Sequence, residues 1–342
     1  MKTILIIGDD SDWESYLKFK KTRKFFKKIR FVTTNYKSVL QNKLPKIDSR
    51  KVLIMLFFPL DYWNNVIETN FVKGRVYGDK KCAVMFYDYL DKVENILDKK
   101  YKNISYVNSF KAVKVDRDKE LTKRIIRKIG VPVPKSYATR NYDDILKLLG
   151  RGKKLYVKVN FGAMGKGITL LSKSSWLTNF IYRNRTIISR KGDYGWKFNQ
   201  ITGNREFLTK LLTKDLVIEE AVDPYVISNK KFDIRYYVVY GKIMHIIIRS
   251  TKISNVVTNI TQGGTKERSE FLQSMPKKYL ADAKRNAIKA SKTLGLNFAG
   301  IDIMISKRGK PYVIEAQSFP GFPESKYNLS EKLAKEIMKK WK

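Results

Sequence analysis

The sequence predicts a mixed α/β (α+β) fold, with an open α/β layer at the N-terminus and an antiparallel sheet in the C-terminal part. Residues 1–115 alternate short apolar runs with amphipathic segments, which is the pattern of strands and helices in an α/β layer. Residues 223–342 contain several strand-like runs and an amphipathic segment at 278–294 that predicts one long helix. Between these parts lies a glycine-rich turn with a strand-like run on each side.

The N-terminal α/β domain, residues 1–115, is expected to contain a small open sheet. Strands are expected at residues 3–7, 52–57, 82–86 and 104–107, and a helix at residues 13–28. Gly8 ends the first strand at a position where such sheets often bind ligands, but no G-x-G-x-x-G pattern follows it. A dinucleotide site is therefore not expected here.

The middle domain, residues 116–222, is expected to begin with a helix at 118–129. This helix has an apolar face and ends at Gly130. A hairpin is expected at residues 154–171, around the glycine-rich turn. The polar and aromatic stretch 179–204 is expected to be an insertion or a lid, which could cover a substrate.

The C-terminal domain, residues 223–342, is expected to contain an antiparallel sheet and the helix at 278–294. The sheet is expected to include strands at residues 216–219, 232–239, 243–249, 300–305 and 311–315. The sequence shows no internal repeat and no low-complexity tract. A repeat architecture is therefore excluded.

The chain carries 70 lysines and arginines against 32 aspartates and glutamates, a formal net charge of +38. A positive field of this size attracts polyanions, including nucleic acid. The basic residues are spread along the chain and form no separate tail. A functional acidic partner and a generally solvated basic surface are therefore both open.

No membrane partner is expected, because the apolar runs are much shorter than the roughly 18 residues of a membrane-spanning helix. The first residues lack a small-residue cleavage site and are expected to form a strand. The single cysteine, Cys82, excludes an internal disulfide and a cysteine-cluster metal site, and favours a cytoplasmic location. Cys82 and the single histidine, His245, lie in apolar runs and are expected to be structural.

The glycine-rich turn is the first candidate site. Gly162, Gly165 and Gly167 would let backbone N–H groups approach phosphates, because glycine tolerates positive φ and adds no side-chain bulk. Lys158 before the turn and Lys166 within it could neutralise phosphate charge. Taken alone, the pattern favours the alternative of an ordinary hairpin with a basic surface.

Two acids in neighbouring strand-like runs form the second candidate site. Asp302 and Glu315 each interrupt apolar surroundings. Side chains alternate along a strand, so Asp302 shares a face with Met304, and Glu315 shares one with Gln317. Pairing of the two strands could therefore bring three oxygen donors together. Mg²⁺ binds such donors and Mn²⁺ could replace it, whereas a salt bridge to a lysine is the alternative.

The order of these motifs resembles the ATP-grasp superfamily, nearest to its RimK-type ribosomal-protein glutamate ligases, over residues 108–321. Each similar segment is weak alone, but their joint order is specific. In chain order the segments are Asn108-Ser109, Arg117-Asp118-Lys119, Lys158 with the three glycines, Glu219-Glu220, Asp233-Ile234-Arg235, Asn259 with Gly263-Gly264, Asp302 with Glu315, and Gln317 to Gly321.

The resemblance implies an ATP-grasp fold behind a pre-ATP-grasp domain, and an ATP-dependent carboxylate–amine ligase that uses Mg²⁺. It implies that Arg235 and Arg249 steady the γ-phosphate and the acyl phosphate that replaces it. It implies ATP binding by Lys119, Lys158, Lys166, Gly162, Gly165, Gly167, Glu219, Glu220, Asp233 and Asn259. It implies metal binding by Asp302, Glu315 and Gln317, with Asn259 as a further donor.

The resemblance also implies the partners, an amino acid or other carboxylate and an amine acceptor. An acidic peptide or protein acceptor would explain the charge. The sequence departs from the family at Gln317, where asparagine is usual, at Val159, where proline is common, and in the stretch 179–204. The alternative function is that of an ATP-grasp-fold protein that lacks ligase activity and binds nucleic acid or another polyanion.

Overall fold

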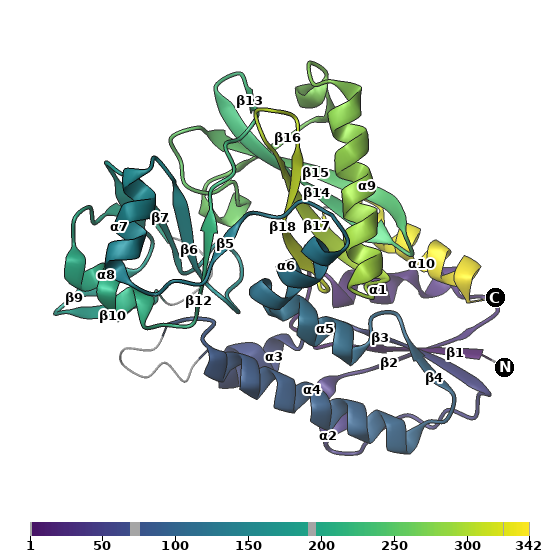
Figure 1. Ribbon diagram of the computed structural model, residues 1–342. Helices are drawn as coiled ribbons and strands as arrows, with labels where there is room; N and C mark the ends of the chain where they lie inside the picture. The colour runs from purple at the N-terminus through teal and green to yellow at the C-terminus, as the bar shows by residue number, and fades with distance from the viewer. Residues whose placement is uncertain (1, 69–75, 191–195, 324, 342) are drawn as a thin grey trace.

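Successive stretches of the chain form three sheets and one separate hairpin (Figure 1). The computed structural model describes residues 2–68, 76–190, 196–323 and 325–341, and each statement about the structure concerns these residues. The N-terminal sheet lies at the bottom of Figure 1, the small sheet at the left and the large sheet at the top.

The N-terminal sheet consists of four parallel strands in the order β2-β1-β3-β4. The strands are β1 (Lys2–Ile7), β2 (Arg30–Thr34), β3 (Lys51–Leu56) and β4 (Ile104–Tyr106), and the helices of this part are α1 (Tyr16–Lys20), α2 (Tyr36–Leu40), α3 (Leu60–Tyr62), α4 (Lys80–Lys100) and α5 (Phe110–Arg117). Leu5 faces one apolar cluster and Ile4 another, so β1 is buried on both faces. The expected strands at 3–7, 52–57 and 104–107 are confirmed.

Other expectations for this part are wrong. Residues 82–86 form the start of α4 instead of a strand, because the Asp79 side chain accepts the backbone N–H of Cys82 and caps the helix. An apolar run of five residues is too short to show which period it follows. The helix expected at 13–28 is only α1 followed by a 3₁₀ turn at Lys21–Phe25, and β2 was not expected because its side chains are half-exposed.

The small sheet contains the predicted hairpin, β6 (Leu155–Val159) and β7 (Ile168–Leu171). Its order is β11-β8-β7-β6-β12-β5, with β5 (Ser136–Tyr137), β8 (Trp176–Thr178), β11 (Asn199–Gln200) and β12 (Leu216–Glu220); α6 (Lys119–Lys128) precedes it, and α7 (Tyr142–Gly150) and α8 (Arg205–Leu212) belong to it. The strand expected at 216–219 is β12, which pairs with β6 and not with the large sheet. Strand periodicity does not show which strand a segment pairs with, so the sequence alone could not place this strand in the correct sheet.

The stretch 179–204 ties two parts of the molecule together. It contains the hairpin β9 (Ile181–Arg183) and β10 (Thr186–Ile188), and its end adds β11 to the edge of the small sheet. Trp196 is 1% exposed and belongs to the apolar cluster of the N-terminal sheet, with Trp63 and Tyr77. The described part of this stretch is therefore anchored at both the small sheet and the N-terminal cluster, and its role as an insertion or a lid stays a prediction.

The large sheet has the order β16-β15-β14-β17-β18, with β13 paired to β14, and all of these pairs are antiparallel. The strands are β13 (Val226–Ile227), β14 (Lys230–Val239), β15 (Lys242–Lys252), β16 (Thr265–Glu267), β17 (Phe298–Ile305) and β18 (Pro311–Gln317). Helix α9 (Lys277–Thr293), predicted at 278–294, covers one face with alanines. Helix α10 (Leu329–Lys340) shares an apolar cluster with β1 and β14 on the other side. The remaining short turns are a π-helical turn at Trp63–Ile67 and 3₁₀ turns at Ile260–Gln262, Ser269–Leu272 and Ser325–Tyr327.

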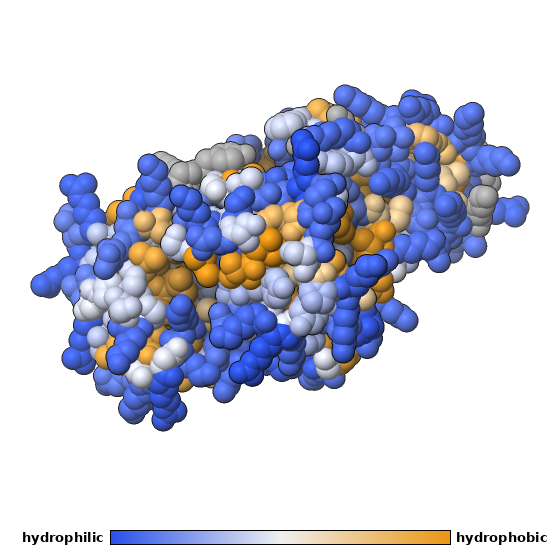
Figure 2. All heavy atoms as spheres, turned by 90° about the horizontal axis from the view of Figure 1, so that it is seen from above, coloured by the Kyte–Doolittle hydropathy of each residue, from blue (hydrophilic) through white to orange (hydrophobic). Residues whose placement is uncertain are grey.

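The face of the molecule seen from above is predominantly hydrophilic (Figure 2). Figure 2 shows the molecule from above, with apolar atoms gathered in a band across the middle and hydrophilic side chains around it. Within the described ranges, no helix has both the length and the apolar content needed to cross a membrane.

We expect Trp196→Ala to lower the free energy of unfolding by about 3–5 kcal/mol, because it opens a cavity in the N-terminal cluster. Trp13→Ala is the matched control, since Trp13 is 64% exposed, and should change this free energy by less than about 0.5 kcal/mol. Urea unfolding followed by circular dichroism measures both values. If both variants change the free energy of unfolding equally little, Trp196 does not anchor the stretch 179–204 to the N-terminal cluster.

Candidate active site

A pocket lies between the small sheet and the large sheet, and it collects most of the predicted site residues. It contains ≈ 910 Å³ of space free of protein atoms, including the part open to solvent. The predicted residues in its lining are Lys119, Lys158, Gly162, Gly165, Lys166, Glu219, Glu220, Asp233, Arg249, Asn259, Asp302 and Glu315. Gly167, Arg235 and Gln317 lie outside this lining.

Four charged side chains of the large sheet form an ion-pair network at the pocket. Asp233, Arg249 and Asp302 are buried and line the pocket, and the partly buried Arg235 lies behind them. The strand register places Asp233 opposite Arg249, and Arg235 opposite Asp302, so all four point to one face. Arg235 donates to both carboxylate oxygens of Asp302, at 2.7 and 2.9 Å. Arg249 donates to Asp233 at 2.7 Å and to Asp302 at 2.8 Å. Each guanidinium uses Nε and Nη2 in these bonds, and Nη1 takes no part in them.

The ion pairs of this network favour the ionised form of its carboxylates. Burial alone would raise the pKa of Asp302, but Arg235 and Arg249 hold that pKa well below its usual range. Burial raises the pKa of Asp233, and Arg249 and the hydroxyl of Thr258 oppose this effect. Asp302 is therefore an anion at neutral pH even though only 3% of it is exposed.

Glu315 lies directly opposite Asp302 on the neighbouring strand, as the sequence predicted. Its Oε1 is 3.3 Å from the Lys119 ammonium, and its Oε2 accepts a hydrogen bond from Gln317 at 3.2 Å. Burial alone would raise the pKa of Glu315, but Lys119 and Arg235 lower it below its usual value. Gln317 thus touches Glu315 from beside the pocket.

The donor set fits a divalent cation only when a ligand completes it. Within the described ranges, no cluster of three or more His, Cys, Asp or Glu side chains could hold a metal ion. Asp302 and Glu315 nevertheless present hard carboxylate oxygens to one pocket. Mg²⁺ is commonly held by one or two carboxylates together with phosphate oxygens, so these two residues match that mode.

The glycine-rich turn closes the opposite side of the pocket. Gly165 and Gly167 have φ of +72° and +65°, which favours glycine at both positions. A Cβ at Gly167 would lie 2.6 Å from Val159, so this glycine also serves packing. The Lys119 ammonium donates to the carbonyl oxygen of Gly162 and so connects α6 to the turn. Asn259 lies beside Gly165, where a Cβ would meet its Oδ1 at 3.2 Å.

Glu219 has a role that the sequence did not reveal. The resemblance implied that its backbone faces a ligand, but its side chain, 2% exposed, forms ion pairs with both Lys158 and Lys123. Lys123 also lines the pocket and was missed. It lies four residues after Lys119 on α6, hence on the same helical face, and this spacing could have identified it. Glu220 instead pairs with Lys153 and Tyr137.

The pocket lining also contains apolar side chains and a further buried lysine. The apolar residues include Ile168, Val222, Met304 and Ile314, which suit the faces of a planar aromatic ring. Lys231 is 7% exposed and donates to the carbonyl oxygen of Val256 at 3.0 Å. Burial lowers the pKa of Lys231 to about 8. These residues carry no motif, so the sequence alone does not identify them.

The single cysteine and the single histidine lie outside the pocket lining. Cys82 is buried on α4, as a structural residue would be. The ring of His245 lies 4.6 Å from that of Tyr327, but its buried Nε2 has no hydrogen-bond partner within the described part of the chain. Burial lowers the pKa of His245 to about 4, so the ring is neutral at pH 7.

Comparison with known sequences identifies relatives of this chain. A family model described as YheC/D like ATP-grasp matches residues 106–341. A probable alpha-L-glutamate ligase of Parasynechococcus marenigrum (strain WH8102) is 26% identical over 221 residues, which cover 64% of this chain and 39% of that protein. One of Aeromonas salmonicida (strain A449) is 26% identical over 226 residues, covering 64% and 61%. The matched part of the chain thus spans between 39% and 61% of the length of these two relatives.

Solved structures share the fold over nearly the whole chain. The macrocyclase MdnC of Microcystis aeruginosa MRC, bound with the precursor peptide MdnA, has a TM-score of 0.59 at 12% identity and covers 99% of this chain and 100% of its own. The D-alanine–D-alanine ligase of Bacillus anthracis complexed with ATP has a TM-score of 0.53 at 17% identity, covering 99% and 96%. The predicted ATP-grasp fold is confirmed.

The pKa of Lys158 gives a testable pH dependence. Burial lowers this pKa to about 8, so in the ligand-free protein the ammonium loses its proton as the pH rises through that value. A bound phosphate favours the charged form. We therefore expect ATP binding to take up protons above about pH 8 and its affinity to fall as the pH rises further. Calorimetry in two buffers of different ionisation enthalpy measures this uptake.

Lys158→Arg is the control for this measurement. An arginine stays charged throughout this pH range, so the variant should take up fewer protons than the wild type. The remaining uptake would come from the other pocket lysines whose pKa burial lowers, Lys119, Lys123 and Lys231. Equal uptake by both proteins would contradict the placement of phosphate at Lys158.

Proposed function

The chain belongs to the YheC/D-like ATP-grasp family, and from this premise we propose that it is an ATP-dependent carboxylate–amine ligase. ATP-grasp enzymes use ATP and a divalent metal ion, and ATP-grasp ligases bind a carboxylate and an amine or peptide substrate. We propose that this chain does both.

One observation carries the proposal. Cations suited to phosphate and carboxylates suited to a metal ion face the same pocket from two different sheets. Lys158 and the glycine-rich turn come from the small sheet, and Arg249, Asp302 and Glu315 come from the large sheet. A phosphate chain between the sheets would touch both groups.

The lining suggests how ATP would lie. The adenine ring would lie against the apolar residues Ile168, Met304 and Ile314, with Glu219 and Glu220 of β12 in the same lining. The ribose would lie near Asp233. The phosphates would then extend past Lys158, Lys119 and the backbone of Gly162, Gly165 and Lys166 to the two arginines.

The chemistry follows from positioning and charge. A carboxylate oxygen of the first substrate attacks the γ-phosphorus in line with the leaving ADP oxygen and forms an acyl phosphate. The Nη1 groups of Arg235 and Arg249 would donate to the transferred phosphoryl oxygens while Asp302 holds both guanidiniums in place. The amine then attacks the acyl carbon, phosphate leaves, and the amine loses a proton. No protein nucleophile is needed.

Asp302 and Glu315 would hold the divalent cation, with Asn259 or Gln317 as a further oxygen donor. The cation would neutralise charge on the phosphates. The Lys119 ammonium pairs with Glu315 in the ligand-free protein, and it would move toward the phosphates because they are also anionic.

The substrates are proposed from the relatives and the charge. The sequence relatives are named probable alpha-L-glutamate ligases, which supports glutamate as one substrate. One solved neighbour is bound with a precursor peptide, which supports a peptide or protein acceptor. A net charge of +38 favours an acidic acceptor.

We expect Glu315→Gln to reduce ATP turnover by about two to three orders of magnitude, because a neutral amide holds the cation poorly at the same size. ADP release with Mg²⁺, amino acids and peptides measures turnover. Glu270→Gln makes the same change at an exposed site and should retain full activity. Full activity of Glu315→Gln would remove this residue from the metal site.

Mass spectrometry tests the reaction itself. Incubation with ATP, Mg²⁺ and a mixed cell extract should yield an acceptor that gains the mass of an amino acid. Salt-sensitive binding of nucleic acid without any ADP release would contradict the ligase and support the polyanion-binding alternative.

A further inference from the structure

Lys166, the lysine inside the glycine-rich turn, is held by groups outside the pocket. Its side chain is 1% exposed, and its ammonium lies 3.2 Å from a carboxylate oxygen of Glu68. The same ammonium lies 4.3 Å from the ring centre of Tyr77 and 6.0 Å from that of Trp196. One carboxylate and two aromatic faces therefore surround it.

We propose that Glu68, Tyr77 and Trp196 form a cage that positions Lys166 and thereby holds the glycine-rich turn against the pocket. This proposal rests on the nucleotide-binding part of the proposed function. It gives Lys166 a positioning role, in place of the direct phosphate contact that the sequence implied. Glu68 and Tyr77 come from the N-terminal part, and Trp196 comes from the connection at 179–204.

The members of the cage are themselves fixed. Glu68 accepts a hydrogen bond from the indole N–H of Trp63 at 3.0 Å, on the same oxygen that faces Lys166. The backbone N–H of Tyr77 donates to the hydroxyl of Ser189 at 2.7 Å. A buried ammonium is costly without a partner, so an ordered carboxylate and aromatic faces favour this one position.

The backbone of the turn is held from the same side. Phe161 donates its N–H to the carbonyl oxygen of Gly78 at 3.2 Å. A Cβ at Gly78 would lie 2.6 Å from the Cα of Gly162, so the two segments approach as closely as glycine allows. Asn179 donates to the carbonyl oxygen of Gly165 at 2.7 Å. We expect release of a nucleotide past this turn to be slower while these contacts and the cage are formed.

If the cage holds the turn, substitutions at Glu68 and Lys166 should affect nucleotide release through the same interaction. Glu68→Gln removes the carboxylate charge from a partly exposed residue, and Lys166→Met removes the ammonium. We expect each variant to release a fluorescent ADP analogue on the order of tenfold faster than the wild type, and the double variant to be no faster than Lys166→Met alone. Lys166→Arg should restore slow release. Stopped-flow fluorescence measures the rates, and circular dichroism checks the fold.

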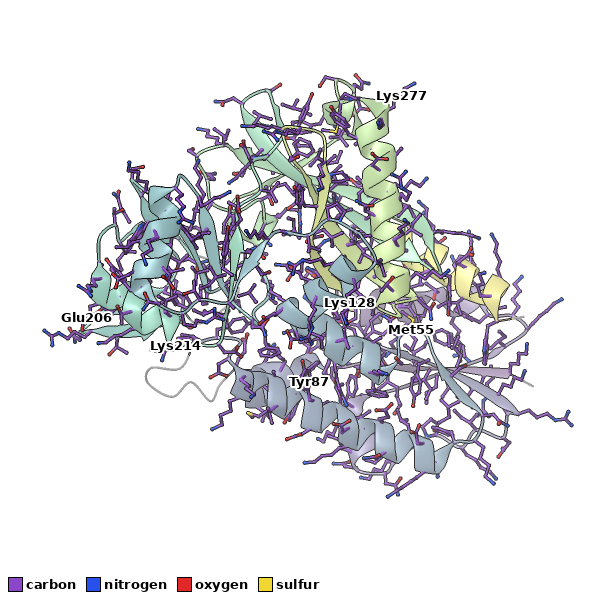
Figure 3. All side chains as sticks on the ribbon, viewed as in Figure 1. Met55, Tyr87, Lys128, Glu206, Lys214 and Lys277 are labelled. Carbon is purple, nitrogen blue, oxygen red and sulfur yellow. The ribbon has the colours of Figure 1, made fainter. Side chains whose placement is uncertain are left out.

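Glu206→Gln is the matched control. Glu206 pairs with Lys210 at 2.9 Å, and Figure 3 shows it at the outer edge of the molecule, beyond the small sheet. Its release rate should equal that of the wild type. If Lys166→Met speeds release while Glu68→Gln behaves like this control, Lys166 contacts phosphate directly and the cage is overturned.

Amide exchange in the ligand-free protein separates the two proposals. Glu68→Gln should increase exchange at residues 162–167, and Glu206→Gln should not. Unchanged exchange at these residues would overturn the cage. Absence of ADP binding by the wild type would contradict the proposed function, while the exchange result still decides the cage.

Discussion

The carboxylate of Asp302, shared between Arg235 and Arg249, organises the ion-pair network at the pocket. Isolated charges would be too costly to bury on this face of the large sheet, so each must have its partner in the correct register. The antiparallel pairing of β14 with β15 and β17 supplies that register. The arginines are thereby held with one nitrogen each outside the network, and Asp302 stays ionised opposite Glu315.

The same principle of paired burial applies on the small sheet. Glu219 is surrounded by Lys123 and Lys158, and these lysines line the pocket with a carboxylate between them. Although the chain has a net charge of +38, several lysines and arginines of the pocket are thus paired with carboxylates. A bound polyphosphate would exchange some of these internal partners for its own oxygens, which is how a preformed site can bind a highly charged ligand without a large net cost.

The sequence predicted those features that depend on local pattern. Alternation along the strands placed Asp302 beside Glu315, and the glycine spacing identified the turn, since both signals lie within a few adjacent residues. It did not predict the partner of Glu219 or the placement of β12, because both depend on contacts between distant segments. The strand expected at 82–86 is the start of a helix of 21 residues, whose buried face continues at helical spacing to Leu97 and whose first turn is capped by Asp79.

A crystal structure with Mg²⁺ and a non-hydrolysable ATP analogue would show whether this pocket holds the nucleotide and the cation. We expect the adenine between Ile168 and Met304, the cation on Asp302 and Glu315, and the γ-phosphate within hydrogen-bond distance of Arg235 or Arg249. An analogue bound elsewhere, or bound here with both arginines and both carboxylates untouched, would contradict this placement.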